Sequence, residues 1–260
     1  MPLTHSSRCS QLTKKRTGQQ QKGPLSGGIR PVQNRPILDV RHHSDEPCVG
    51  VLTIGKPSDC QIIRDGQSVH KRGSRVRMEE SRVLLFALLL QLPVPAVHGV
   101  ISSEPGTEIV MDFVDGESLE EAWPAITAEQ KHSIAVQVGL LVTSMRQAKP
   151  HRRKIGAFEG PARDCRQFSD YFGGPFENET DFDRHCLDLL RGTPSQIRKP
   201  LPETLSSEHR IVLTNADLTP RNIFVKEGRA QTLLNWEHAG WYPEYWEYVK
   251  FFDRPTGCKD

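Results

Sequence analysis

The stretch that most constrains the fold of this chain lies between residues 211 and 237. Short apolar runs cover residues 210–213, 223–225 and 231–234. A polar loop with Asp217 and, five residues later, Asn222 separates the first two runs, and Asn235 directly follows the third. Short apolar runs bounded by turn residues are typical of strands. The pattern therefore predicts three strands whose ends deliver Asp217, Asn222 and Asn235 to one site.

The residue types at these positions suit one kind of chemistry. Phosphoryl transfer uses an Asp near the substrate hydroxyl, together with an Asn and an acidic group that hold the metal. Asp217 and Asn222 have this Asp-x4-Asn spacing, which alone is equally typical of a capped loop. The flanking strands, the downstream sequence Asn-Trp-Glu at 235–237 and the aromatic run at 241–248 favour the phosphotransfer interpretation. The tryptophans of this region, Trp236, Trp241 and Trp246, are interpreted as packing residues.

The rest of the ordered chain predicts a mixture of strands and helices. Asp65-Gly66 favours a tight hairpin turn between strands at 61–64 and 67–70. Helices are expected at 78–92, 118–123, 127–147 and 180–190, and two further strands at 97–100 and 108–113. Thr127 and Gln130 have the spacing of a capping box. Strands with one helix come first and mostly helices follow, which predicts an α+β protein with two unlike lobes.

The N-terminal segment differs from the remainder. Residues 1–56 are rich in polar, Gly and Pro residues and have no apolar periodicity, so we expect a disordered leader and an ordered domain at 57–260. With 34 basic and 32 acidic side chains, the net charge gives no reason to expect a nucleic-acid or membrane partner. The apolar run at 83–92 is too short to span a bilayer. The six scattered cysteines match no zinc framework, and we expect a reducing, cytoplasmic location.

Residues 211–250 resemble the catalytic region of the aminoglycoside phosphotransferase (phosphotransferase enzyme) family. The pattern of that family begins with roughly His-Gly-Asp-x-x-Pro-x-Asn-Ile. A strand, a turn and a second strand follow, and the pattern ends with Ile-Asp-Trp-Glu. The resemblance extends, with fewer matching residues, over 93–123 and 65–90. It implies a protein-kinase-like two-lobed fold, with a reduced, β-rich small lobe at 57–110 and a mostly helical large lobe at 111–260. The early end of the chain could leave the large lobe truncated.

The resemblance also implies roles for residues of the large lobe. Asp217 would be the catalytic base or would orient the substrate hydroxyl. Asn222 and Asn235 would be ligands of Mg²⁺.

In the small lobe, Lys71 would contact the α- and β-phosphates of ATP and pair with Glu80. The backbone between Met111 and Phe113 would meet the adenine. Two alternatives stay open here: Glu79 is an equal candidate for the pairing, and Lys71 could be a solvated basic residue at a strand end.

Three positions depart from the family pattern. Asn215 stands where the family usually has His, Ala216 where it has Gly, and Asn235 where it has Asp. Mg²⁺ is commonly held by one or two carboxylates plus phosphates, so the amide at 235 should weaken metal binding. Furthermore, no clear Gly-rich phosphate loop precedes Lys71.

Three hypotheses follow. The first is an ATP-dependent phosphotransferase that acts on a hydroxyl of a small molecule and is impaired by Asn215 and Asn235. The second is an inactive relative that binds a nucleotide or a partner. The third is an incomplete chain that does not fold alone. The sequence identifies neither the acceptor nor the oligomeric state.

Overall fold

The structure is a computed structural model that describes residues 51–54, 60–103, 106–150, 154–165, 170–201, 205, 208–253 and 256–258. Residues 1–50, most of the expected leader, lie outside the described residues. Strand β1 (Val51–Ile54) falls inside the segment expected to be a leader, and it pairs with β2.

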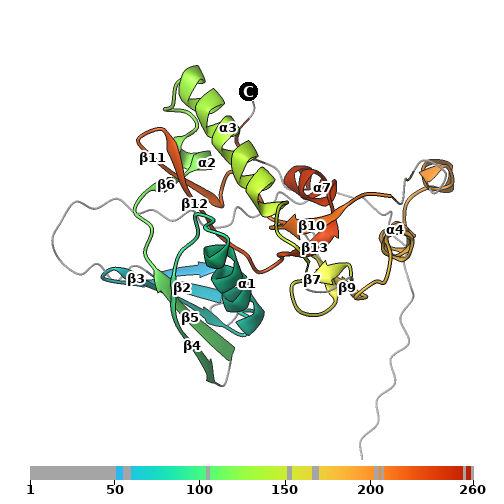
Figure 1. Cartoon of the computed structure of the whole chain (residues 1–260), viewed down its shortest axis with the longest axis horizontal. Helices are drawn as coiled ribbons and strands as arrows, with labels where there is room; N and C mark the ends of the chain where they lie inside the picture. The colour runs from blue at the N-terminus through green and yellow to red at the C-terminus, as the bar shows by residue number, and fades with distance from the viewer. Residues whose placement is uncertain are drawn as a thin grey trace, which may run out of the picture. The chain divides into compact units, whose positions relative to one another are not determined.

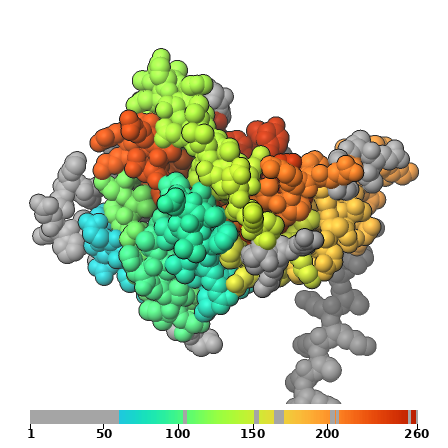
Figure 2. Space-filling model, in the orientation of Figure 1, coloured from blue at the N-terminus to red at the C-terminus, as the bar shows by residue number. Residues whose placement is uncertain are grey.

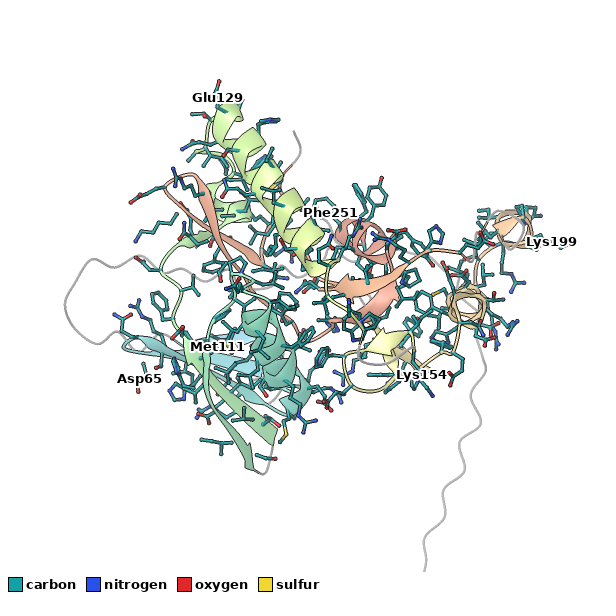
Figure 3. All side chains as sticks on the ribbon, in the orientation of Figure 1. Asp65, Met111, Glu129, Lys154, Lys199 and Phe251 are labelled. Carbon is teal, nitrogen blue, oxygen red and sulfur yellow. The ribbon has the colours of Figure 1, made fainter. Side chains whose placement is uncertain are left out.

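A five-stranded antiparallel sheet dominates the N-terminal half of the described chain (Figure 1). Its order is β1-β2-β3-β5-β4, with bounds Cys60–Asp65 (β2), Ser68–Gly73 (β3), Val97–Ser103 (β4) and Gly106–Asp112 (β5). The expected hairpin is confirmed: β2 ends at Asp65, and Gly66 takes a φ of +58°, which its missing side chain permits. This sheet carries Lys71 on β3 and Met111 on β5, and Figure 3 labels Met111 on β5.

Helix α1 (Met78–Leu89) packs against the sheet with its apolar side. Val83, Leu84 and Ala87 are buried in one core cluster with Ile109 of β5. The helix ends slightly before the expected residue 92, ahead of Pro93, which cannot continue a helix. The opposite end of α1 places Glu80 in its first turn, facing the sheet that carries Lys71.

The C-terminal half is built around α3 (Ala128–Met145). The expected capping box is confirmed, because Thr127 and Gln130 exchange side-chain and backbone hydrogen bonds. Ile134 and Met145 are fully buried on this helix, which packs on β10 (Ile211–Thr214) and β12 (Arg229–Leu233). Figure 2 shows the yellow-green surface of α3 running between orange-red residues that are far away in sequence.

Short strands complete the C-terminal half. One sheet has the order β12-β11-β6, with β11 at Ile223–Lys226 and β6 at Glu117–Ser118. Another has the order β10-β13-β7, with β13 at Gly240–Pro243 and β7 at Gly156–Ala157. Strands β8 (Ala162–Cys165) and β9 (Asp170–Gly173) pair with each other. The remaining helices are α2 (Leu119–Ala122), α4 (Glu179–Asp188), α5 (Ser195–Arg198) and α7 (Trp246–Phe252).

The expected strands before and after the Asp217 loop are thus present, whereas β13, β7, β8 and β9 were not predicted. Trp236, Trp241 and Trp246 are buried, with at most 6% of their surface exposed, which confirms that they are packing residues. Trp236 and Trp241 belong to the same core cluster as α1 and α3. One continuous core therefore supports both the five-stranded sheet and the C-terminal strands. Among the described helices, none has the length and apolar character needed to cross a bilayer.

The packing of α3 gives a stability prediction. Ile134 is 1% exposed, whereas Val136 on the same helix is 50% exposed. We expect Ile134→Ala to lower the free energy of unfolding by about 3 kcal/mol, because it leaves a cavity in the core. Val136→Ala should change it by less than about 0.5 kcal/mol. Urea unfolding followed by tryptophan fluorescence measures both, and equal midpoints for the two variants would contradict the packing described here.

Candidate functional site

The loop between β10 and β11 carries the first part of the candidate site. Asn215 and Asp217 are both buried, at 0% and 3% exposure, although both are polar. Ala216 between them has a φ of +62°, in the left-handed region that costs a non-glycine residue about 1–2 kcal/mol. A conformation of this kind persists only where the surroundings enforce it, and it is common at functional sites.

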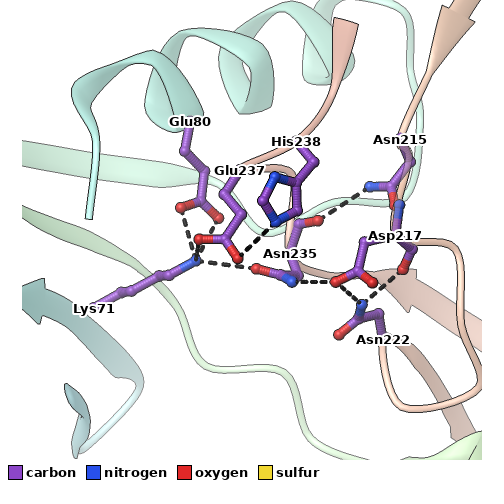
Figure 4. Close-up of polar contacts among 8 residues, drawn as sticks. All are labelled: Lys71, Glu80, Asn215, Asp217, Asn222, Asn235, Glu237 and His238. Carbon is purple, nitrogen blue, oxygen red and sulfur yellow. Dashed lines mark hydrogen bonds and ion pairs between the residues drawn. The ribbon is translucent and has the colours of Figure 1, made fainter. Parts of the chain in front are cut away.

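The three residues predicted from the strand pattern meet at the carboxylate of Asp217 (Figure 4). Its Oδ2 accepts a hydrogen bond from Asn222 Nδ2 at 2.9 Å and another from Asn235 Nδ2 at 2.5 Å. Asn222 Nδ2 also donates to the main-chain oxygen of Asp217 at 2.7 Å. The two amides therefore fix the orientation of the carboxylate.

Asn215 lies behind this group and links its two sides. Its Oδ1 accepts from the backbone N–H of Asp217 at 3.0 Å, and its Nδ2 donates to the main-chain oxygen of Asn235 at 3.3 Å. A buried amide offers both an acceptor and a donor, so Asn215 can brace the loop from both directions. Asn235 itself has a φ of +58°, which Asn tolerates better than most residues.

Lys71 of β3 joins the site from the five-stranded sheet. Its Nζ donates to both oxygens of Glu80, at 2.8 and 2.7 Å, and to Asn235 Oδ1 at 3.2 Å. Lys71 is 7% exposed and Glu80 is 3% exposed. The partner of Lys71 is thus Glu80 and not Glu79, and the ammonium group is buried and not solvated at a strand end.

Burial and charge act in opposite directions on Lys71. Removal from water alone would lower the pKa of its ammonium group. The negative charges of Glu80 and, at 4.0 Å from Nζ, of Glu237 more than offset this, and the pKa is raised above its ordinary value. Lys71 therefore stays positively charged throughout the physiological pH range.

The backbone expected to meet the adenine is already hydrogen-bonded. The N–H of Asp112 donates to Ala96 O and that of Phe113 donates to Gln67 O, both at 2.9 Å. The guanidinium of Arg64 stacks on the ring of Phe113, 3.6 Å from its centre. Met111 is buried in the core. A purine placed here would have to use carbonyl oxygens of this segment or displace an existing bond.

Among the described residues, no group of three or more His, Cys, Asp or Glu side chains is arranged to hold a metal ion. The oxygen atoms near Asp217 come from its own carboxylate and from the amides of Asn222 and Asn235. These are oxygen ligands of the kind that Mg²⁺ prefers, but the amide at 235 supplies no charge. A cavity of about 230 Å³ between α3 and β12 does not include any of these residues.

Glu247 of α7 is a site residue that the sequence did not single out. It is 7% exposed and accepts hydrogen bonds from the backbone N–H groups of Asn215 and Ala216. An acidic residue between Trp246 and Tyr248 carries no sign of burial in the sequence alone.

Comparison with known proteins agrees with this geometry. The sequence pattern of the phosphotransferase enzyme family matches residues 65–257, which include every residue of the site just described. The chain belongs to this family. A comparison with curated protein sequences gave no match.

Solved structures of aminoglycoside phosphotransferases share the protein-kinase-like, two-lobed α+β fold of this chain. A thermostable mutant of APH(4)-Ia in ternary complex with ADP and hygromycin B has a TM-score of 0.56 at 16% identity, over 78% of this chain and 70% of that one. An aminoglycoside-3′-phosphotransferase of type VIII has a TM-score of 0.53 at 12% identity, over 79% and 77%. The streptomycin–ATP–APH(2″)-IIa complex has a TM-score of 0.52 at 12% identity, over 77% and 69%. At these identities the similarity establishes the fold.

The buried ion pair predicts that substitutions of Glu80 and Glu79 change the free energy of unfolding by different amounts. Glu80→Gln leaves the buried charge of Lys71 without its main partner, and we expect a loss of about 3 kcal/mol in the free energy of unfolding. The matched change Glu79→Gln should cost less than about 1 kcal/mol, because Glu79 is only half-buried. Because Lys71 remains protonated, the difference should be constant between about pH 6 and 9. Chemical denaturation at several pH values measures it, and a larger effect at Glu79 would refute the pairing.

Proposed function

We propose that this protein binds ATP at the site formed by Lys71, Asp217, Asn222 and Asn235, and that it transfers the γ-phosphate to a hydroxyl group of a small molecule. Asp217 is the base or orienting group for that hydroxyl. Lys71 binds the α- and β-phosphates and is held in position by Glu80. The acceptor is a small molecule that carries a hydroxyl group.

The observation that carries this proposal is the connection between Lys71 and Asp217. Family membership alone would leave open whether this chain still assembles its site. The carboxamide of Asn235 lies 3.2 Å from Lys71 Nζ and 2.5 Å from Asp217 Oδ2. A single side chain, that of Asn235, thus bridges the proposed phosphate-binding cation and the proposed hydroxyl-orienting carboxylate. Transfer between a nucleotide and an acceptor requires these two groups to be close together.

Asn222 and Asn235 would hold Mg²⁺ through their amide oxygens together with the phosphates of the nucleotide. The ion would neutralise charge on those phosphates. The donor atoms fit Mg²⁺ in kind, but with one carboxylate fewer than in the family pattern. We therefore expect weak metal binding and slow turnover.

The second candidate is a nucleotide-binding protein without catalytic turnover. The contacts of Asn235 favour it, because its amide donates to Asp217 and accepts from Lys71. These groups are thereby satisfied without a metal ion. Such a protein would bind ATP with little dependence on Mg²⁺ and would act through the bound nucleotide or through a partner.

Calorimetric titration with ATP, with and without Mg²⁺, tests the proposed site. We expect the natural protein to bind ATP with an affinity that Mg²⁺ changes by less than about threefold. Asn235→Asp restores a charged oxygen ligand, and Mg²⁺ should then tighten binding by about tenfold or more, equivalent to about 1.4 kcal/mol.

Asn178→Asp is the matched control, because it is the same substitution at the exposed N-cap of α4, where Asn178 bonds to Asp181 and to no residue of the proposed site. It should leave ATP binding unchanged. If the natural protein binds Mg·ATP tightly, the importance given to Asn235 is wrong. If neither protein binds ATP, the proposed nucleotide site is wrong.

Turnover separates the two candidate functions. Transfer of radiolabelled γ-phosphate should be measured over a panel of hydroxylated small molecules, with water as the reference acceptor. We expect Asn235→Asp to raise the rate by up to about a thousandfold, the equivalent of about 4 kcal/mol. Adding Asp217→Asn to this variant should return the rate to background. Asn235→Asp that binds Mg·ATP but transfers no phosphate to any acceptor would favour the non-catalytic candidate.

A further inference from the structure

Two arginines from distant parts of the sequence meet at the hairpin of β8 and β9. Arg163 of β8 lies directly opposite Phe172 of β9, and side chains that face each other in this way lie on the same side of the hairpin. The guanidinium of Arg77, the residue before helix α1, lies over the Phe172 ring, 5.8 Å from its centre. Phe172 thus places Arg77 and Arg163 beside each other.

The guanidinium of Arg163 has a donor without an acceptor. Its Nε is buried and has no hydrogen-bond partner among the described residues, although the side chain as a whole is only half-buried. Buried donors of folded proteins are nearly always paired with protein, water or a ligand. Arg77 is exposed, and within the described part of the chain neither guanidinium forms an ion pair. The donors of both arginines are therefore available to a ligand.

The charges around Arg163 favour an anionic ligand. Burial lowers the pKa of Arg163, and the like charge of Arg77 lowers it further, whereas the carboxylates of Glu79 and Glu237 oppose the fall. A guanidinium nevertheless keeps its proton throughout the physiological pH range, so the two arginines repel each other. A carboxylate or phosphate bound between them would remove this repulsion. The planar set of donors on an arginine suits both of these groups.

The hairpin is attached to the strands that carry the Asp217 loop. The backbone N–H of Arg163 donates to the hydroxyl of Tyr242 at 3.3 Å. Tyr242 belongs to β13, which pairs with β10, the strand directly before this loop. Ala162 is buried in the same core cluster as Ala216, the residue before Asp217. Arg163 and Asp217 therefore each follow a residue of one packed cluster, and the hairpin holds Arg163 at the proposed site.

We propose that Arg163 and Arg77 bind an anionic group of the acceptor, so that the acceptor is a hydroxylated small molecule with a carboxylate or a phosphate group. Lys71 is the proposed contact of the nucleotide phosphates, and the two arginines are additional to it. An acceptor anchored by its anionic group would present its hydroxyl to Asp217 from a fixed position. This inference rests on the proposed function in identifying the ligand as the acceptor, whereas the anion site itself rests on the two arginines.

Calorimetric titration of the full chain with inorganic phosphate tests the anion site. The ionic strength is held constant, because screening would otherwise change the affinity. We expect saturable binding with a Kd of about 1–10 mM. Arg163→Gln and Arg77→Gln should each weaken it by about tenfold or more, because hydrogen bonds between charged groups are lost. Arg163→Lys keeps the charge but not the planar set of donors, and it should give an intermediate affinity.

Arg72→Gln is the matched control for the loss of one positive charge. Arg72 is exposed and bonds to Gln61, and as the strand neighbour of Lys71 it points to the opposite face of the sheet. The substitution should leave the Kd of phosphate within about twofold of the natural value, because distant exposed charges are screened. Arg77 is exposed and its side chain does not cap α1, so Arg77→Gln tests the site even if Arg163→Gln does not fold.

A second titration, with ATP, separates an acceptor anion from the phosphates of the nucleotide. Phosphate should still bind when ATP is saturating, and the two Arg→Gln variants should change the Kd of ATP by less than about threefold. If ATP displaces phosphate, the arginines belong to the nucleotide site and the acceptor assignment is wrong. Phosphate binding that is absent, or equal in all variants, refutes the anion site. If ATP does not bind but arginine-dependent phosphate binding remains, the proposed function fails and the anion site stands.

Discussion

The carboxamide of Asn235 is the contact on which the organisation of this site depends. It accepts a hydrogen bond from Lys71 of the five-stranded sheet and donates one to Asp217 of the loop after β10. Lys71 and Asp217 are 146 positions apart in the sequence, and both are buried. One neutral side chain thus satisfies a cation and an anion together. The positions of β3, of the Asp217 loop and of the end of β12 are coupled through it.

The buried charges explain why so many polar side chains surround this contact. An ion removed from water costs several kcal/mol unless partners replace its hydration. Lys71 donates hydrogen bonds to both carboxylate oxygens of Glu80. The carboxylate of Asp217 accepts from two side-chain amides, and that of Glu247 accepts from two backbone N–H groups. Loss of one partner would therefore leave a buried charge whose desolvation is no longer compensated, which would destabilise the fold. The packing of α1, α3 and the buried tryptophans supplies the rigid frame that keeps these partners at bonding distance.

The structure of a segment could be predicted from the sequence where neighbouring residues determine it. The Asp65-Gly66 turn, the Thr127 cap and the apolar runs around Asp217 each lie within a few residues, and the structure contains all of them. The pairing of β13 with β7 was not predictable, because such short strands are stabilised by partners that are distant in sequence. The role of Glu247 was hidden for the same reason. Its burial follows from the approach of α7 to the loop, which no local pattern records.

The same geometry shows what an Asp at position 235 would require. Its carboxylate would lie where the amide nitrogen now sits, 2.5 Å from Asp217 Oδ2. Two buried carboxylates at such a distance cannot both ionise unless a cation lies between them or one takes up a proton. An Asp at 235 would therefore need a bound proton or a nearby cation, such as a metal ion or the ammonium group of Lys71. The amide in this chain removes that requirement, because it is neutral and hydrogen-bonds to both Asp217 and Lys71. The substitution that we expect to weaken metal binding is thus also the one whose amide hydrogen-bonds to both Lys71 and Asp217.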